Sequence, residues 1–379
     1  AIICLRGGYG TPRLLDRIDL ELLQNNAKPF IGYSDITALH LAISRYAGFV
    51  TFHGPLLNAY LLGDKQKPTE SSFFNMLRGQ VKAGSVLAHP GGWPLTTIER
   101  GEGVWLYGYD GRRYLDAISS WWVNLFGHAN PRINAAITAQ LGKLEHVILA
   151  GFTHEPAVRL AERLTSLAPP GMSRCFYADN GSSAIEVALK MSFHYWRNQG
   201  RSRKQRFVTL SNSYHGETLG ALAVGHVELY REIYQPLLMD VMIAPSPDAY
   251  AREAGETADD CARRAIAAMD QLLAQHADET CAVIVEPLVQ CAAGMRMHAP
   301  LYLQLLRETC DRHGVHLIAD EIAVGFGRTG TMFACEQAGI TPDFICLSKG
   351  LTGGYLPLSV VLTNEDVYSA FYDEYTQQR

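Results

Sequence analysis

The chain has 379 residues, of which 47% are hydrophobic and 19% charged, a composition typical of a folded globular protein with a sizeable core. Its formal net charge of -5 excludes a strong overall basic field of the kind that attracts nucleic acid or an anionic membrane surface. We therefore expect small-molecule substrates as partners, with no nucleic acid and no membrane among them.

Neither a membrane span nor a metal centre is predicted. No apolar run approaches the roughly 18 residues that a spanning helix needs, and no charged leader precedes a cleavable apolar segment. The eight cysteines form no C-x-x-C pair and have no histidine at zinc-finger spacing. We interpret them as reduced thiols that mostly pack in the interior, which indicates a cytoplasmic location.

Residues 1–98 have the pattern of an incomplete α/β unit. The first residue is not Met, and residues 1–5 already form an apolar run typical of a buried strand, so we expect the chain to begin inside a domain. Short apolar runs then alternate with helical patterns. Helices are expected at 14–23 and 37–46, and strands at 30–33 and 49–52.

A second unit is expected over residues 99–379. It begins with a hairpin, because Asp110-Gly111 favours a tight turn between two apolar runs. Strands and helices then alternate, which predicts a mostly parallel sheet with helices on both faces, an α/β fold. Helices are expected at 133–144, 154–167, 184–196, 259–275 and 301–313, and strands at 206–210, 282–285, 316–319 and 344–347.

Polar residues follow several of these strands, where open α/β sheets bind ligands. Asp320 and Lys349 form one such pair: a carboxylate can keep a pyridine nitrogen protonated, and an amine can bond covalently to an aldehyde. Taken singly, each has a simpler interpretation, Asp320 as a helix cap and Lys349 as a surface charge. Glu286 also ends a strand, and we interpret it as a polar strand end only.

Two further segments could complete a site. Gly181 and Ser182 precede a helix and offer backbone NH groups and a hydroxyl, which suit a phosphate, although a plain helix cap is the alternative. Tyr214 could pack on a flat ring, with core packing as its alternative. Residues 325–330 spell G-x-G-x-x-G but lie in no strand-turn-helix unit, so we reject a dinucleotide site.

These residues resemble the class III pyridoxal-phosphate aminotransferases. The motifs that carry the resemblance are Asp320-Glu321, Gly325-Phe326-Gly327-Arg328-Thr329-Gly330, Leu347-Ser348-Lys349-Gly350 and Gly353-Gly354. Within the class, a second group of motifs is similar to the adenosylmethionine-8-amino-7-oxononanoate aminotransferases. They are Ser119-Ser120-Trp121-Trp122, Gly127-His128, Gly151-Phe152-Thr153-His154 and Ser213-Tyr214-His215-Gly216-Glu217-Thr218.

The resemblance implies a fold type I large domain, a homodimer and the cofactor pyridoxal 5'-phosphate. Lys349 would hold the cofactor covalently and act as the catalytic residue, and Asp320 would pair with its ring nitrogen. Gly181 and Ser182 would bind its phosphate, Tyr214 would stack on the ring, and Trp121 and Tyr214 would line the substrate pocket. The implied reaction converts 8-amino-7-oxononanoate to 7,8-diaminononanoate with S-adenosylmethionine as amine donor, in biotin synthesis.

The first hundred residues resemble a different family, the LD-carboxypeptidases that trim murein peptides. The motifs are Arg6-Gly7-Gly8-Tyr9-Gly10, Gly32-Tyr33-Ser34-Asp35-Ile36-Thr37 and Thr51-Phe52-His53-Gly54-Pro55. Ser34 matches that family's nucleophile, and its alternative role is a helix cap. The family's histidine and glutamate belong to a later domain that is expected to be missing here, so we interpret Ser34 as a vestigial nucleophile.

The chain is thus interpreted as an LD-carboxypeptidase fragment joined to an aminotransferase that lacks its C-terminal part. The resemblance places a substrate-binding arginine beyond Arg379, so turnover by this chain alone is an open question. Three alternatives remain: a related class III enzyme for ornithine, acetylornithine or 4-aminobutyrate, a serine carboxypeptidase, and a non-catalytic fusion of two fragments.

Overall fold

The computed structural model describes residues 2–3, 18–27, 30–32, 39, 43–47, 52–53 and 97–372. The chain divides into two compact units. One comprises Ala1–Arg100 and Tyr107–Ala117, and the other comprises Gly101–Leu106 and Ile118–Arg379.

In the first unit, the described residues include three short parallel strands in the order β1-β2-β3, namely β1 (Ile2–Ile3), β2 (Phe30–Gly32) and β3 (Phe52–His53). Helix α1 (Leu20–Asn25) begins at Asp19, whose Oδ1 accepts a hydrogen bond from the Leu22 amide at 2.8 Å. The π-helical turn η3 (Ile43–Ala47) contributes to a small apolar cluster with Phe30. Ser34 lies outside the described residues.

The hairpin predicted at Asp110-Gly111 is present. Strands β4 (Ile98–Glu102), β5 (Trp105–Gly108) and β6 (Arg113–Leu115) form a sheet in that order. Gly111 has a φ of 77°, and Asp110 Oδ1 accepts a hydrogen bond from the Arg112 amide at 3.0 Å. The turn therefore forms for the reason that the sequence suggested, a glycine at a left-handed position.

Within residues 97–372, seven strands form the main sheet, in the order β7-β15-β14-β13-β10-β8-β9. Five neighbouring strands, from β14 to β9, are parallel, and β15 runs antiparallel between β14 and β7. The predicted mostly parallel α/β sheet is confirmed. The strands are β7 (Arg174–Ala178), β8 (Arg206–Leu210), β9 (Met242–Ala244), β10 (Thr280–Val285), β13 (His316–Asp320), β14 (Phe344–Leu347) and β15 (Ser359–Thr363).

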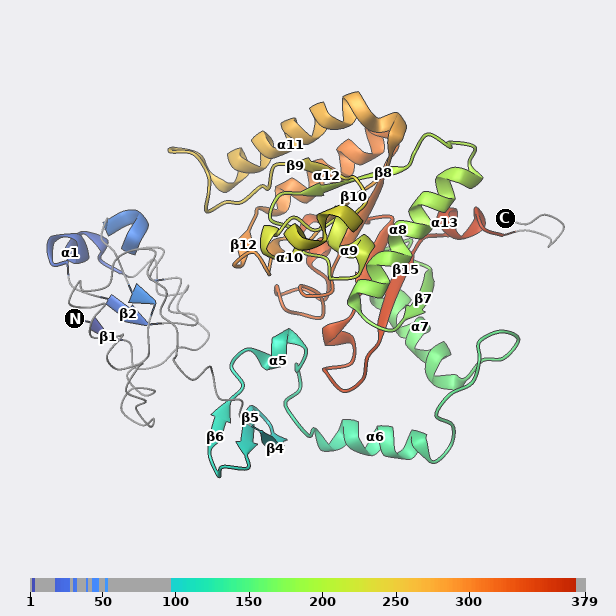
Figure 1. Cartoon of the computed structure of the whole chain (residues 1–379), viewed down its shortest axis with the longest axis horizontal. Helices are drawn as coiled ribbons and strands as arrows, with labels where there is room; N and C mark the ends of the chain where they lie inside the picture. Colours follow the sequence, from blue (N-terminus) through green and yellow to red (C-terminus); the bar gives the residue numbers. More distant parts are fainter. Residues whose placement is uncertain are drawn as a thin grey trace. The chain divides into compact units, whose positions relative to one another are not determined.

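Helices cover both faces of this sheet (Figure 1). In β10, Val283 and Val285 belong to the apolar cluster that contains α11 (Ala258–His276) and α12 (Pro300–His313). The alternate residues Ala282 and Ile284 belong to the cluster on α8 (Gly181–Asn198). Successive side chains of a strand point to opposite faces, so an uninterrupted apolar strand is buried by both helical layers.

The remaining elements connect these layers. They are α5 (Ser119–Trp122), α6 (Pro131–Leu141), α7 (Glu155–Leu167), α9 (Leu219–Ala223), α10 (Glu228–Arg231), η4 (Glu232–Leu237), η5 (Ala277–Glu279), β11 (Val289–Gln290), β12 (Arg296–Met297), η6 (Ala334–Ala338), η7 (Lys349–Leu351) and α13 (Glu365–Ser369). In the part of the chain that the structure describes, no helix has the length and apolar character to cross a membrane.

Candidate active site

A cavity of about 280 Å³ lies where the strands β10, β13 and β14 end. It brings together Trp121, Gly181, Ser182, Tyr214, Asp320 and Lys349, the residues that the sequence singled out in this part of the chain. Its other lining residues are Trp122, Asn180, His215, Gly216, Glu286, Cys291, Ala292, Ile322, Ala323, Val324 and Ser348. Parallel strands place their carboxyl ends at one edge of the sheet, which explains why residues so distant in sequence converge.

The N-terminus of helix α8 forms one wall of the cavity. Asn180 is the N-cap, because its Oδ1 accepts a hydrogen bond from the Ser183 amide at 3.1 Å. Ser182 is therefore not the capping residue: its Oγ accepts a hydrogen bond from the Glu217 amide at 3.2 Å and lines the cavity. The positive end of the helix dipole and this hydroxyl suit an anion such as a phosphate.

Gly216 is required by the close approach of two segments at this wall. Its φ is 127°, and a Cβ at this position would lie 2.0 Å from the Ser182 hydroxyl oxygen. Gly181 is also confined, since a Cβ there would lie 3.2 Å from the Ile322 side chain. Larger residues at either position would displace the groups that surround the cavity.

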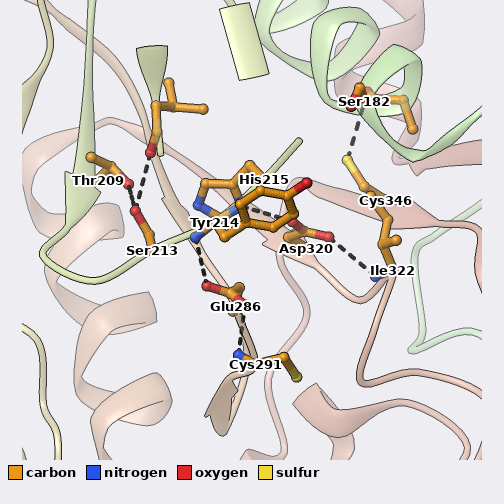
Figure 2. Close-up of polar contacts among 12 residues, drawn as sticks. Ser182, Thr209, Ser213, Tyr214, His215, Glu286, Cys291, Asp320, Ile322 and Cys346 are labelled. Atoms are coloured by element: carbon orange, nitrogen blue, oxygen red, sulfur yellow. Dashed lines mark hydrogen bonds and ion pairs between the residues drawn. The ribbon is translucent and has the colours of Figure 1, made fainter. Parts of the chain in front are cut away.

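Asp320 lies at the end of β13 and is only 5% exposed. Its Oδ2 lies 2.7 Å from Nδ1 of His215, and its Oδ1 accepts a hydrogen bond from the Ile322 amide at 3.1 Å (Figure 2). The His215 Nε2 atom is buried and has no hydrogen-bond partner among the described residues. Asp320 is thus neither a surface residue nor a helix cap but a buried acid with a fixed histidine partner.

Lys349 follows β14 and begins the 3-10 turn η7. Burial is the main cause that lowers the pKa of its amine, and the Asp320 carboxylate partly offsets this effect. Its Nζ lies 5.7 Å from the centre of the Trp122 ring. A lysine with a lowered pKa has more of the neutral amine, which is the nucleophilic form.

Tyr214 follows β8 and extends along the cavity. Its hydroxyl donates a hydrogen bond to Glu217 Oε1 at 3.2 Å, and its ring packs edge-on against Tyr230 at 5.4 Å between centroids. Burial, assisted by Glu217, raises the pKa of Tyr214 to about 12, so the hydroxyl remains protonated at neutral pH. Tyr214 thus lines the cavity and also has an aromatic packing partner.

Glu286 is the cavity residue that sequence reasoning undervalued. We interpreted it as a polar strand end, but its carboxylate accepts hydrogen bonds from the amides of Tyr214 and Cys291, each at 3.0 Å. Burial raises the pKa of this carboxyl to about 7. Its position after the apolar strand β10, which matches the positions of Asp320 and Lys349 after their strands, was the signal that could have identified it.

The two tryptophans reach the cavity on a left-handed turn. All four residues of α5 have positive φ: 51° at Ser119, 47° at Ser120, 70° at Trp121 and 68° at Trp122. For L-residues this conformation costs about 1–2 kcal/mol per residue. Part of the compensation is a hydrogen bond of 2.7 Å from an Arg328 nitrogen to the Trp122 carbonyl oxygen. Strain of this kind is commonly retained at functional sites.

The G-x-G-x-x-G segment at 325–330 forms a succession of turns and is not followed directly by an α-helix. Gly327 and Gly330 have φ values of 87° and 108°, consistent with tight turns. The segment instead supplies Arg328 to the tryptophan turn. The segment therefore lacks the strand-turn-helix arrangement in which this motif binds a dinucleotide.

Two family models match this chain. The model for class-III aminotransferases covers residues 86–375, which include every lining residue of the cavity. The chain belongs to the class-III aminotransferase family. The model for the LD-carboxypeptidase N-terminal domain matches residues 1–54, in agreement with the second resemblance seen in the sequence.

Curated relatives within this family carry the name adenosylmethionine-8-amino-7-oxononanoate aminotransferase. The protein of Geobacter sulfurreducens is 45% identical over 287 residues, 76% of this chain and 63% of its own length. The protein of Helicobacter pylori is 48% identical over 289 residues, 76% of this chain and 64% of its own length. This chain therefore covers less than two thirds of the length of either relative.

Solved structures of the family agree with the fold. A crystal structure of adenosylmethionine-8-amino-7-oxononanoate aminotransferase from Methanocaldococcus jannaschii matches with a TM-score of 0.69 and 34% identity, covering 80% of this chain and 68% of that one. A PLP-bound amine transaminase from an uncultivated Pseudomonas species matches with a TM-score of 0.69 and 35% identity, covering 76% and 66%. The predicted α/β fold of a pyridoxal-phosphate transferase is confirmed.

Proposed function

We propose that this chain carries the catalytic region of an aminotransferase that converts 8-amino-7-oxononanoate to 7,8-diaminononanoate, with S-adenosylmethionine as amine donor and pyridoxal 5'-phosphate as cofactor. The observation that carries the proposal is that Lys349, Asp320 and the N-terminus of helix α8 line one cavity. The names of relatives that are 45% and 48% identical support the choice of reaction.

The groups present fit the cofactor in chemical type. An amine with a lowered pKa at Lys349 suits an aldehyde, a buried carboxylate at Asp320 suits a pyridinium, and the helix N-terminus with Ser182 suits a phosphate. The chain thus offers a matching partner for the aldehyde, the ring nitrogen and the phosphate of the cofactor. Tyr214 adds an aromatic face.

When bound, pyridoxal phosphate supplies an electron sink for carbanion chemistry. The residues of this chain bind and orient it and move protons. Asp320 would hold the proton on the ring nitrogen, and the Lys349 amine would hold the cofactor and move the proton of the substrate carbon. Gly181 and Ser182 would bind the phosphate, and Tyr214 would pack against the ring.

Trp121 is proposed as a wall for the substrate. Its side chain is 63% exposed, lies on the rim of the cavity and stacks on Trp122 at 5.8 Å between centroids. An exposed aromatic surface of this kind suits an apolar chain or a heterocycle. An amine-donor screen separates this proposal from a related enzyme: transfer from ornithine, acetylornithine or 4-aminobutyrate, without transfer from S-adenosylmethionine, would contradict it.

The cofactor assignment is tested by the visible absorbance of the protein after addition of pyridoxal phosphate. We expect a new band that borohydride converts to a stable adduct on Lys349, identified by peptide mass spectrometry. The Lys349→Ala variant should lack the adduct. The exposed Lys143 offers a control, since Lys143→Ala should retain it. An unchanged adduct in Lys349→Ala would overturn the assignment.

A homodimer is part of the proposal. Elements α10 and η4 expose Leu229, Ile233 and Leu237, whose side chains are 81%, 85% and 64% exposed. Neighbouring apolar side chains with this exposure favour burial against a partner. We expect sedimentation to give a dimer and the double variant Leu229→Lys, Ile233→Lys to give monomers. A monomeric parent protein would contradict the proposal.

We also propose that the aminotransferase region begins near residue 99 and that residues 1–98 form a separate piece. The two family models support this division, since one ends at residue 54 and the other begins at residue 86. Limited proteolysis should then cut first near this boundary. Rapid cleavage within 118–372 instead would contradict the division.

The LD-carboxypeptidase match at 1–54 supports a second candidate function for the N-terminal piece. Its test is the release of D-alanine from a murein tetrapeptide. We expect no release, because the match covers only the N-terminal domain of that family, whereas its histidine and glutamate belong to a later domain. Release that is lost in Ser34→Ala would instead favour this second function.

A cytoplasmic location is also proposed, since the seven cysteines in the described ranges are free thiols, as in reducing compartments.

A further inference from the structure

Glu286 connects two segments that line the cavity. Its Oε2 accepts a hydrogen bond from the Tyr214 amide and its Oε1 accepts one from the Cys291 amide, both at 3.0 Å (Figure 2). Tyr214 follows strand β8, and Cys291 follows the short strand β11. One carboxylate therefore joins backbone groups that are 77 residues apart, one from each of two segments that line the cavity.

The Tyr214 amide begins a segment that carries one residue proposed to contact the cofactor and one residue that pairs with Asp320. Tyr214 itself supplies the aromatic ring, and the next residue, His215, pairs with Asp320 at 2.7 Å. Ser213, just before them, is fixed separately by hydrogen bonds with the Thr209 hydroxyl at 2.8 Å and the Val224 carbonyl at 3.2 Å. Glu286 thus adds a restraint at the Tyr214 amide, between the anchored Ser213 and the His215–Asp320 pair.

Burying the Glu286 carboxyl group costs free energy of folding, and a residue that only ends a strand would not need to be buried in this way. Burial raises the pKa of the Glu286 carboxyl to about 7, an effect that His215 and the two amide donors partly offset. The backbone of Glu286 is fixed as well, since its carbonyl lies 3.2 Å from Nε2 of the buried His298. A buried carboxyl group whose side chain and backbone are both held by hydrogen bonds can define the position of the groups bound to it.

We propose that Glu286 is a positioning residue that holds Tyr214 and His215 in place for the cofactor ring. This inference rests on the proposed function. Glu286 acts through the Tyr214 amide on the tyrosine ring and on the His215–Asp320 pair. Replacing Glu286 should therefore weaken cofactor binding more than a control substitution that destabilises the protein to the same extent.

The chain contains a matched control for this proposal. Glu321 is also fully buried, its pKa is also raised to about 7 by burial, and its carboxylate also accepts two backbone hydrogen bonds, from Ala334 and Cys335, at 2.8 Å each. These amides begin the 3-10 turn η6, and Glu321 is not among the residues that line the cavity. Glu286→Gln and Glu321→Gln therefore remove the same chemistry from two different places.

The first measurement is amide hydrogen exchange of the protein without cofactor, at a pH above 7. A glutamine can accept only one of the two hydrogen bonds well, so Glu286→Gln should speed exchange at Tyr214, Cys291 or both by roughly 10-fold to 100-fold. Glu321→Gln should leave both amides unchanged. This measurement does not depend on the proposed function and tests the contact even if the wild-type protein binds no cofactor.

The second measurement is pyridoxal-phosphate affinity, followed by visible absorbance, with visible circular dichroism as a report on the bound ring. Glu286→Gln should weaken binding by roughly 10-fold or more and alter the dichroic band, whereas Glu321→Gln should change neither. If Glu286→Gln does not fold, Glu286→Asp, which shortens the reach by one methylene, serves in its place. Unchanged exchange in the Glu286 variant, or an equal loss of affinity in both variants, would overturn the proposal.

Discussion

Nδ1 of His215 lies 2.7 Å from Oδ2 of Asp320, and both side chains are buried at the carboxyl end of the main sheet. Asp320 comes from the end of β13 and His215 from the segment after β8, two strands separated in the sheet by β10. The pair fixes the orientation of a carboxylate that otherwise has one local backbone donor, the Ile322 amide. Its orientation is therefore determined before any ligand enters the cavity.

Substitutions of Asp320 and of His215 should reduce aminotransferase activity by different amounts. Asp320→Asn removes the charge that would stabilise a protonated ring, so we expect a loss in kcat/KM of roughly 10²-fold or more. His215→Gln leaves that charge in place but loosens its orientation, and roughly a 10-fold loss is expected. His316 offers a control: it is also buried and bonded, to Ser192 at 2.9 Å, but lies outside the cavity. Equal losses in His215→Gln and His316→Gln would contradict the assignment.

The left-handed turn at Ser119–Trp122 predicts a stabilising substitution. Ser120 has φ 47° and ψ 52°, a conformation that glycine adopts without the steric cost of a Cβ. Ser120→Gly should raise the free energy of unfolding by about 0.5–1 kcal/mol, measured by urea denaturation, after allowance for the greater entropy of an unfolded glycine. On helix α7, Ser166→Gly should lower it by about 1 kcal/mol. A lower stability in Ser120→Gly would show that the turn is not strained.

The buried Glu321 predicts a pH dependence of stability with a defined sign. Burial raises its pKa from 4.5 to about 7, so the folded protein binds this proton more tightly than the unfolded chain does. The stabilisation is complete below pH 4.5 and is lost as the pH rises through 7. The free energy of unfolding of the wild-type protein, relative to that of Glu321→Gln, should therefore fall by up to about 3 kcal/mol as the pH rises from 4.5 through 7.

Urea denaturation of both proteins at several pH values checks this difference. The comparison removes the contribution of groups that titrate in the same range, such as His316, whose pKa burial lowers to about 4. An advantage that grows as the pH rises would contradict the sign.

Removing the hydroxyl group of Tyr302 should not lower the melting temperature. Its side chain is completely buried in helix α12, and its hydroxyl has no hydrogen-bond partner among the described residues. A buried polar group without a partner costs about 1–3 kcal/mol, so Tyr302→Phe should leave the melting temperature unchanged or raise it. Tyr195 is the control, because its hydroxyl donates a hydrogen bond to Asp366 at 2.7 Å, and Tyr195→Phe should lower the melting temperature.

Much of the aminotransferase region could be predicted from the sequence because its strands are buried on both faces. Strands β8 and β14 have the predicted bounds, since each is a short, mainly apolar segment followed by a polar residue. The same rule identified Asp320 and Lys349, which line the cavity. Strands β7, β9 and β15 were not predicted. Strand β9 has only three residues and those of β7 are half-buried or exposed, whereas the buried strand β15 carries an apolar run, Val360–Leu362, that the prediction overlooked.

Other features of the site depend on tertiary contacts that no local pattern contains. The role of Glu286 follows from amides that are 72 residues before it and five residues after it in the chain. The positive φ of Trp121 and Trp122 contradicts their intrinsic preferences and is held in part by Arg328, which is 206 residues from Trp122. Sequence patterns report intrinsic preference, so a conformation imposed by distant groups cannot be read from them.

Strand β15 has a consequence for any shortened version of this protein. It follows Lys349 in the chain, yet it lies between β14 and β7 and is the strand that pairs β7 to the rest of the sheet. A protein ending just after Lys349 would possess every reactive group named above. It would nevertheless lose the strand that pairs with β7, and β7 leads directly to the N-terminus of helix α8 in the cavity wall. A shortened protein that keeps the complete main sheet must therefore extend through Thr363.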